Sequence, residues 1–266
     1  MLHLDRQASD DLELGGELSG APAGARRYIA RRDLAALAQL SFRANGDANF
    51  TLPAEISGVE LEELSQSFAA APAAEVVLAI CNDRYQATYS RQYLARHHPL
   101  LVLRINGQDP SGWPKSPDGL AMGPYLISHP SFLSGPVADS EGDEPQIPWG
   151  VVRLEFEPAK TVFGAIAPTG RAASRPEVQA GYRIAQQNCL RCHFLGAEGG
   201  KKSGRSWQVL AAWASSSPAY FSAYVRQPQS ARQGAQMPAN PKYDDADLAA
   251  LTAYFQSFAL SSGGKP

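Results

Sequence analysis

The sequence contains little cysteine and lacks long apolar runs. Three cysteines occur among 266 residues, and two of them, Cys189 and Cys192, lie three positions apart, which leaves Cys81 without an obvious partner. This excludes the disulfide framework of a small secreted domain. No apolar run approaches the roughly 20 residues that a membrane-spanning helix needs. The sequence therefore predicts no membrane-spanning segment.

The net charge of −2 is also small, but its distribution is uneven. Residues 1–170 carry 13 Lys and Arg against 21 Asp and Glu, a balance of −8, whereas residues 171–266 carry 11 against 5, a balance of +6. Two regions of opposite sign favour two domains in a chain of this length. We expect no nucleic-acid partner for either domain.

The first region has the pattern of a sheet-rich α+β domain at residues 29–160. Residues 1–28 are rich in Gly, Ala, Asp and Glu without a sustained period, and we interpret them as an extended or disordered arm. Helices are expected at 31–40 and 58–70, and strands at 76–80, 100–105 and 151–157. In the last strand Val152, Leu154 and Phe156 would share one face.

The second region has a helical pattern. Residues 161–173 lose periodicity and gain Pro and Gly, which indicates a linker. A helical domain is expected at 174–260, with one helix entering the cysteine motif, one from Ser217 to Pro228 and a last one from Asp244 or Asp245. Residues 261–266 are interpreted as a disordered tail.

The segment Cys189-Leu190-Arg191-Cys192-His193 carries the chemistry of this domain. Two cysteines at this spacing can reach the two vinyl groups of one porphyrin, and a histidine directly after the second cysteine falls below the iron. A structural zinc site would need a second ligand pair, which this region lacks. A redox Cys-x-x-Cys pair would leave His193 without a role. The motif therefore predicts one covalent haem c.

Around this motif the chain resembles the class I c-type cytochromes over residues 174–260. In that family a Gly-aromatic pair of the first helix packs on an aromatic residue of the last helix, and Gly181-Tyr182 and Tyr254 occupy the matching positions. The resemblance also implies a second axial ligand from a methionine followed by proline. Met237-Pro238 lies 44 residues after His193, and Met1 and Met122 lie in the other region. His193 and Met237 are thus the expected iron ligands, with His3, His97, His98 and His129 as distant alternatives to Met237.

The chain departs from that family where a proline usually follows the motif. Residues 194–207 contain no proline, so the partner of the His193 ring N–H is unassigned, while Gly196, Gly199 and Gly200 indicate a loop of unusual backbone freedom. Arg205 and Trp207 are candidates for a haem propionate, although an indole is more often a core residue. The basic cluster Lys201, Lys202 and Arg205 is either a solvated loop or a docking rim for an acidic partner.

The first region resembles the molybdopterin-binding domain of the sulfite oxidase family over about residues 50–160. The resemblance rests on the segments 78–87, 123–127 and 148–152, and it implies that Cys81 corresponds to the molybdenum ligand. The basic residues that hold the anionic pterin in that family have no counterparts at Ile127-Ser128-His129 and Pro148-Trp149. A domain without molybdopterin, with Cys81 as a buried small hydrophobe, is therefore preferred. The histidines before Pro99 and Pro130 are interpreted as loop or surface residues.

Together these patterns predict a multi-domain α+β chain that works as an electron carrier rather than an enzyme. The expected function is single-electron transfer to a redox protein partner in an exported respiratory or dehydrogenase chain, with the first domain serving in docking. The alternative is a molybdenum-dependent oxidoreductase with its own haem acceptor. Covalent haem attachment normally follows export, so we expect a periplasmic or exported protein whose signal segment, which is not visible before Asp5, has been removed.

Overall fold

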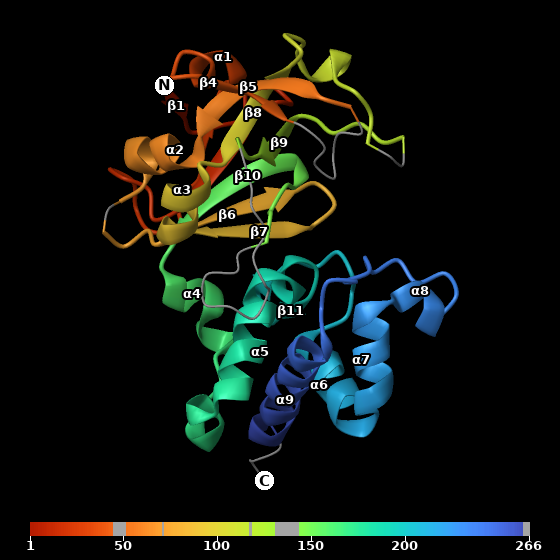
Figure 1. Cartoon of the computed structure of the whole chain (residues 1–266). Coiled ribbons are helices and arrows are strands. Elements are labelled where there is room, and N and C mark those ends of the chain that lie inside the picture. Colours follow the sequence, from red (N-terminus) through yellow and green to blue (C-terminus); the bar gives the residue numbers. More distant parts are fainter. Residues whose placement is uncertain (45–51, 71, 117–118, 131–143, 263–266) are drawn as a thin grey trace. The chain divides into compact units, whose positions relative to one another are not determined.

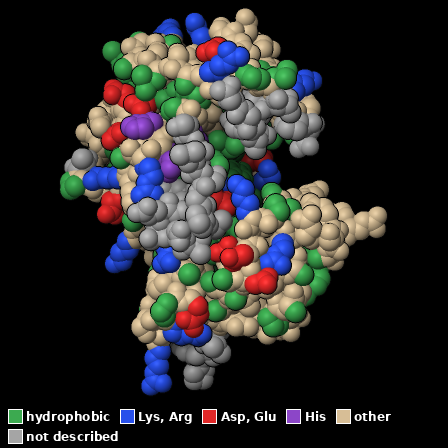
Figure 2. Space-filling view, viewed as in Figure 1, with side chains coloured by type: hydrophobic (Ala, Val, Ile, Leu, Met, Phe, Trp, Pro, Cys, Tyr) green, Lys and Arg blue, Asp and Glu red, His purple; other side chains and the backbone are tan. Residues whose placement is uncertain are grey.

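The computed structural model describes residues 1–44, 52–70, 72–116, 119–130 and 144–262. The chain divides into a sheet-rich unit, Met1–Leu133 with Pro145–Val162, and a helical unit, Ser134–Glu144 with Phe163–Pro266 (Figure 1). Acidic and basic side chains are interspersed over the visible surface of both units (Figure 2). Within the described residues, no helix combines the length and the apolar character needed to cross a bilayer.

Ten strands of the described sheet-rich unit form one mixed sheet around β10 (Trp149–Glu157). The other strands are β1 (Leu2–His3), β2 (Leu12–Gly16), β3 (Arg27–Ile29), β4 (Leu40–Ala44), β5 (Ala54–Glu60), β6 (Val76–Cys81), β7 (Gln86–Ser90), β8 (Leu100–Ile105) and β9 (Tyr125–Ser128). Their order is β1-β3-β2-β10-β9-β8-β5-β4, with β6 pairing to both β10 and β7. β10 runs parallel to β2 and antiparallel to β6 and β9. The short helices α1 (Arg31–Leu34), α2 (Leu61–Phe68) and α3 (Arg91–His97) accompany this sheet.

The strands predicted at 76–80, 100–105 and 151–157 are present as β6, β8 and β10. β8 begins with four buried apolar residues because this part of the strand is covered on both faces: Leu101 and Leu103 join one core cluster and Val102 joins another. In β10 the pairing is irregular between Val151 and Arg153. Val151 therefore joins Leu154 and Phe156 in the core, and Val152, which was expected there, is half-buried.

Residues 1–28 are not the extended arm that the sequence predicted. They contribute β1, β2 and the start of β3, and β2 lies between β3 and β10. Leu12 and Leu14 are fully buried. A three-residue alternation is too short to reveal a strand by period, and the polar residues around it masked the signal.

Two predicted helices are also shorter than expected. The helix predicted at 58–70 begins only at Leu61, because Ala54–Glu60 is strand β5 and pairs with β8. The helix predicted at 31–40 ends at Leu34, and β4 begins at Leu40. Pairing with a neighbouring strand outweighed the local helical spacing of residues such as Val59.

The helical unit is built around two long helices, α5 (Pro176–Gln187) and α9 (Asp245–Ser262). Along the chain, these two helices are separated by the 3-10 helix η4 (Cys189–Arg191), the hairpin β11 (Phe194–Leu195) and β12 (Glu198–Gly199), and helices α6 (Trp207–Ser216), α7 (Pro218–Arg226) and α8 (Pro228–Ala231). α9 packs against both α5 and α6 (Figure 1). A Cβ at Gly181 would lie 2.1 Å from the Ala250 carbonyl oxygen, so glycine permits the close approach of α5 and α9. Tyr182 and Tyr254 pack beside this crossing with ring centroids 5.7 Å apart.

Residues 161–173 are not a free linker. α4 (Ala159–Phe163) and the 3-10 helices η2 (Gly164–Ile166) and η3 (Gly170–Ser174) occupy the segment. Ile166 is fully buried, and its carbonyl oxygen accepts a hydrogen bond of 2.6 Å from Tyr254 Oη. This hydrogen bond joins α9 to a segment whose composition resembled a linker.

The last helix reaches into the predicted tail. Ser261 and Ser262 are helical, and residues 263–266 lie outside the described part of the chain.

Candidate functional site

The cysteine motif lies at the C-terminal end of α5, where the chain tightens into η4. His193 N–H donates to the Cys189 carbonyl oxygen at 2.9 Å, and Cys192 N–H donates to the same oxygen at 3.2 Å. The motif is thus folded back on itself, and its two cysteines remain partly accessible. This places the two sulfur atoms and the imidazole ring in one short, internally bonded turn.

Two glycines after the motif allow the chain to pack directly onto this turn. A Cβ at Gly200 would lie 1.9 Å from the Arg191 carbonyl oxygen, and one at Gly199 would lie 2.4 Å from the His193 carbonyl oxygen. Gly199 also has a φ of 87°. Gly200 N–H donates to the Leu190 carbonyl oxygen at 2.8 Å. The glycine-rich loop therefore serves close backbone approach to the motif.

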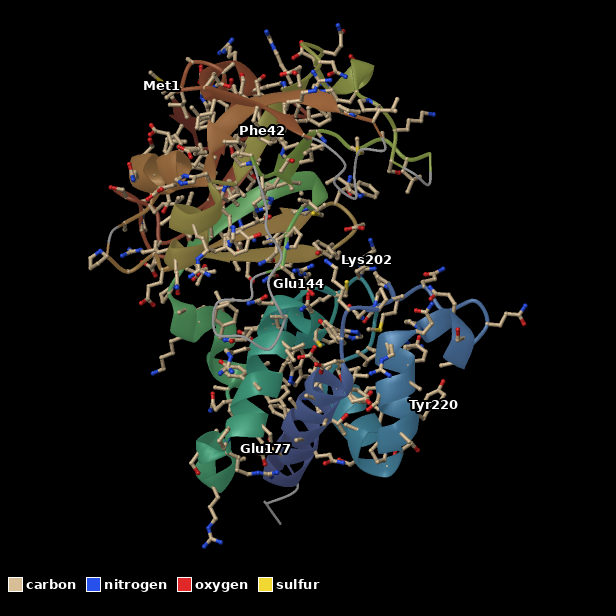
Figure 3. The ribbon with its side chains drawn as sticks, viewed as in Figure 1. Met1, Phe42, Glu144, Glu177, Lys202 and Tyr220 are labelled. Atoms are coloured by element: carbon tan, nitrogen blue, oxygen red, sulfur yellow. The ribbon has the colours of Figure 1, made fainter. Side chains whose placement is uncertain are left out.

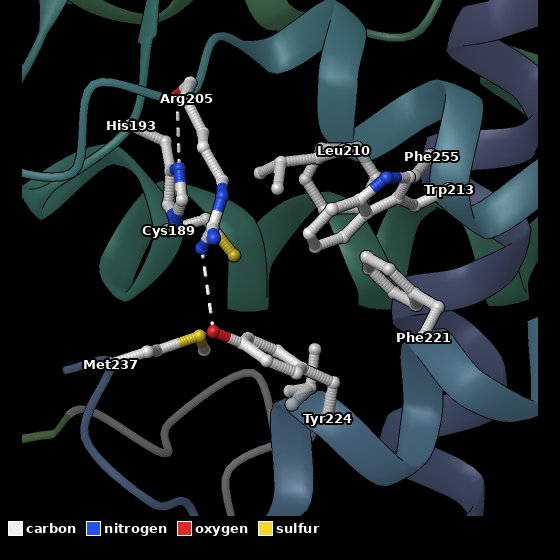
Figure 4. A pocket seen from close by; sticks show the side chains of 10 residues that line it. Cys189, His193, Arg205, Leu210, Trp213, Phe221, Tyr224, Met237 and Phe255 are labelled. Carbon is white, nitrogen blue, oxygen red and sulfur yellow. Dashed lines mark hydrogen bonds between the residues drawn. The ribbon is translucent and has the colours of Figure 1, made fainter. Parts of the chain in front are cut away.

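Three of the four predicted site residues converge on one pocket (Figure 4). Cys189, His193 and Met237 line it, and Figure 4 shows the His193 ring and the Met237 thioether on two sides of it. About 360 Å³ of space lies among these residues, and part of it is open to solvent. The other residues that line the pocket are mostly apolar or aromatic: Arg205, Leu210, Trp213, Phe221, Tyr224, Val225 and Phe255. Cys192 does not line the pocket, although it belongs to the same turn.

The His193 ring is held by two oxygen atoms that sequence reasoning did not find. Nδ1 lies 3.0 Å from the Arg205 carbonyl oxygen and 2.9 Å from Ser203 Oγ. In the family that the sequence resembles, a proline carbonyl is the partner of the histidine ring N–H. Here the carbonyl of Arg205, twelve residues after the histidine, lies in hydrogen-bond distance of that nitrogen. With Nδ1 engaged in this way, Nε2 is the ring nitrogen left to ligate a metal. No local pattern in the sequence marks either partner.

The pKa values of the motif support binding rather than redox or nucleophilic chemistry. Burial lowers the pKa of His193, which keeps the imidazole neutral and its lone pair available. Burial raises the pKa of Cys189 to about 12. This direction is opposite to the lowered pKa of redox-active Cys-x-x-Cys pairs. Within the described residues, no three His, Cys, Asp or Glu side chains are grouped as a metal site would require.

Arg205 adds a permanent positive charge to the pocket wall. Its guanidinium carbon lies 5.1 Å from the Trp213 ring centroid, and its Nη1 donates to Tyr224 Oη at 3.3 Å. Within the described parts of the chain, Arg205 has no carboxylate partner. A flat apolar ligand that carries carboxylates would satisfy both the aromatic wall and this charge. The donor set, the apolar lining and Arg205 together fit a haem.

The segment that carries Met237 is anchored to the end of α7. Asn240 N–H donates to the Arg226 carbonyl oxygen at 3.0 Å, and Asn240 Nδ2 donates to the Val225 carbonyl oxygen at 2.9 Å. These are carbonyls that a helix end leaves without helical partners. Gln229 Nε2 donates to the carbonyl oxygen of Met237 itself at 3.2 Å. The loop is therefore tied to α7 and α8 on both sides of the methionine.

Trp207 is a core residue rather than a ligand contact. It is fully buried, and its Nε1 donates to Tyr254 Oη at 3.0 Å. Lys201 and Lys202 are exposed on the loop of residues 200–206, which we name the basic loop (Figure 3). Ser203 and Arg205 connect the basic loop to His193, so its charges lie beside the pocket.

In the sheet-rich unit, the remaining candidate residues lie in the core or in a polar network. Cys81 ends β6, is 3% exposed and belongs to the main apolar cluster. His129 was expected in a loop or on the surface, but it is buried, and its Nε2 lies 2.9 Å from Tyr93 Oη. His98 lies 3.0 Å from Glu60 at the exposed end of α3. His97 and His129 both pack against the ring of Tyr93, with their own ring centroids 6.3 Å apart.

Comparison with known proteins identifies the helical unit. The family model described as cytochrome c oxidase, cbb3-type, subunit III matches residues 176–255. Cytochrome c oxidase subunit 2 of Alkalihalophilus pseudofirmus is 32% identical over 87 residues, which are 30% of this chain and 25% of that protein. Residues 176–255 therefore form a cytochrome c domain, and such a domain implies haem and electron transfer.

Among solved structures, the sulfane dehydrogenase SoxCD from Paracoccus pantotrophus is similar to 57% of this chain. The TM-score is 0.37 and the sequence identity is 14%, with 40% of the SoxCD chain covered. A likeness this distant does not assign the sheet-rich unit to the sulfite oxidase family. The chain spans about a quarter of the length of the oxidase subunit and less than half of the SoxCD chain.

Proposed function

We propose that this protein is a monohaem c-type cytochrome that transfers single electrons in an exported respiratory or dehydrogenase chain. Cys189 and Cys192 would bind one haem c through thioethers, and His193 and Met237 would ligate its iron. The observation that carries the proposal is the pocket itself, in which Cys189, His193 and Met237 line one apolar space. Haem would supply a one-electron couple at its iron.

The residues around the pocket have roles that suit electron transfer. His193 Nε2 and the Met237 thioether would both hold the iron, and an iron held by two protein ligands would transfer electrons rather than bind a substrate. Leu210, Phe221 and Phe255 would present an apolar wall to the haem, and a low local polarity would limit the reorganisation that accompanies a change of charge. Arg205 would offset the negative charge of the propionates. The unit therefore holds its ligands in place while one electron arrives or leaves.

The sheet-rich unit would serve in docking rather than catalysis. The burial of Cys81 in the apolar core suits the role of a small hydrophobe at the end of a strand. Export to the periplasm is part of the proposal, since thioether attachment of haem normally follows export. The partner would be a redox protein, and an acidic docking face on it would complement the basic loop.

Metal and haem analysis of the purified protein tests this proposal. We expect about one iron per chain, all of it in a haem that stays with the denatured polypeptide under acidic organic extraction. Variants Cys189→Ala and Cys192→Ala should each reduce this covalent attachment, whereas Cys81→Ala should not. Stoichiometric molybdenum would contradict the carrier function and support the oxidoreductase alternative, and a protein without covalent haem would overturn the proposal as a whole.

The positive charge of the basic loop should speed the reaction of the haem with anionic redox reagents and slow its reaction with cationic ones. In the double variant Lys201→Glu with Lys202→Glu, we expect slower oxidation by the anion ferricyanide and faster oxidation by a cationic cobalt complex. At low ionic strength the change should be on the order of tenfold, and it should shrink with added salt. Stopped-flow absorbance of the haem measures both rates.

A matched control for this experiment is the double variant Arg175→Glu with Arg171→Glu, which reverses two charges at the start of the helical domain. It should change both rates much less. Equal changes in the two double variants would show that net charge, and not the basic loop, governs the encounter.

A further inference from the structure

The imidazole of His193 has an unusual pair of oxygen partners on one nitrogen. Nδ1 lies 2.9 Å from Ser203 Oγ and 3.0 Å from the Arg205 carbonyl oxygen. A neutral histidine that ligates iron through Nε2 carries its single proton on Nδ1. That one proton is therefore shared between a hydroxyl and a carbonyl.

Ser203 is itself fixed in place from both sides. Its backbone N–H donates to the Cys192 carbonyl oxygen at 3.2 Å, which ties it to the cysteine motif. Its Oγ accepts a hydrogen bond of 3.1 Å from Arg205 N–H. The same hydroxyl donates to the Arg205 carbonyl oxygen at 3.5 Å. The hydroxyl thus closes a ring of hydrogen bonds among His193, Ser203 and Arg205, although the serine lies on an exposed part of the basic loop.

We infer that Ser203 is a positioning residue that acts through His193 to lower the reduction potential of the haem. This inference rests on the proposed function, because it requires His193 to be an iron ligand. An acceptor on Nδ1–H increases the electron density of the ring and makes it a more basic ligand. A more basic ligand stabilises ferric over ferrous iron. Ser203 adds a second acceptor to the one that the Arg205 backbone supplies, and it also fixes the ring against rotation.

The variant Ser203→Ala removes the hydroxyl and leaves the Arg205 carbonyl in place. We expect the potential of the full-length holoprotein to rise, with the equilibrium constant for reduction increasing about threefold to tenfold, which is roughly 30 to 59 mV for one electron. Exchange of the His193 Nδ1 proton with solvent, followed by NMR of the reduced protein, should become faster. The axial ligands and the unfolding midpoint should not change.

A pair of variants separates the hydroxyl from the shape of the side chain. Ser203→Thr keeps the hydroxyl and should retain the native potential and proton exchange, whereas Ser203→Val has the same volume as threonine and should behave like Ser203→Ala. Ser215→Ala is a matched serine control: Ser215 Oγ donates to the Ala211 carbonyl oxygen within α6, and its removal should not shift the potential.

The outcomes distinguish this inference from the proposed function. A wild-type protein without covalent haem would overturn the proposed function and this inference together. Covalent haem with intact axial ligation, but with equal potentials in Ser203→Thr and Ser203→Val, would overturn the inference alone. An equal shift in Ser215→Ala would overturn it as well, because the effect would then not depend on contact with His193.

Discussion

Replacement of Met237 by leucine should lower the reduction potential more than any other single substitution considered for this protein. Leucine matches methionine in volume but offers no thioether, so the packing of the loop should survive while the proposed methionine ligand is lost. Axial ligands set haem potentials over a range of about 0.8 V, and methionine lies toward its upper end. The ferric thioether-to-iron charge-transfer band should disappear, and the ferrous protein should bind carbon monoxide rapidly.

Met122→Leu provides the matched control. Met122 is a buried methionine of the sheet-rich unit, where it packs in the smaller apolar cluster. Its replacement should leave the potential, the absorption band and the slow reaction with carbon monoxide unchanged. If Met237→Leu kept the native potential and band, a different sixth ligand would be required. Rapid carbon monoxide uptake by the wild-type protein would instead indicate an open iron, as in a gas sensor.

Replacement of Gly181 by alanine should cause a large loss of stability in the helical unit. The new Cβ would lie 2.1 Å from the Ala250 carbonyl oxygen and 2.7 Å from Tyr254 Cβ. Both atoms belong to the backbone or the rigid root of a side chain, so α5 and α9 must move apart. In an open helix the same change would stabilise by about 1 kcal/mol. Overpacking costs about 1 to 3 kcal/mol or more. We therefore expect the clash to outweigh the gain in helix propensity, so that the substitution destabilises the helical unit.

Denaturant unfolding followed by haem absorbance measures this loss in the helical unit. The midpoint should fall without a change in the attached haem. Arg183→Ala is the control, because Arg183 is exposed two positions later in α5 and the substitution introduces the same residue. It should stay within about 0.5 kcal/mol of the wild type. A Gly181→Ala protein as stable as this control would show that the two helices need no close contact.

Much of the helical unit could be predicted because its signals are local, although α6 (Trp207–Ser216) was not predicted. α7 and α9 begin at Pro218 and Asp245, at or next to the positions that proline and acidic residues indicate for helix starts. The cysteine spacing is a property of five adjacent residues. Asp244 and Asp247 bond each other's backbone N–H groups at 2.8 to 3.2 Å, and such a cap is also local. These elements needed no knowledge of distant neighbours.

The sheet-rich unit was harder to predict because its strands depend on their partners. The segment Ala54–Glu60 has apolar residues that suit a helix, yet β8 offers it a register of hydrogen bonds. β2 was missed because its position between β3 and β10, not its composition, makes it a strand. Residues 161–173 look like a linker until α9 supplies a contact for Ile166. Strand pairing and long-range burial are not encoded in a local period.

The sequence by itself predicted the ligand set proposed for this protein, because two thiols and an imidazole within five residues, with a single methionine in the same half, leave few options. Only the tertiary structure decided how that set is assembled. It showed that Met237 lines the same pocket as His193, that Gly199 and Gly200 are required by close backbone approach, and that oxygen atoms of Ser203 and Arg205 both lie within hydrogen-bond distance of His193 Nδ1. These relations join residues across loops, where hydrogen bonds and packing act in space and leave no spacing rule in the chain.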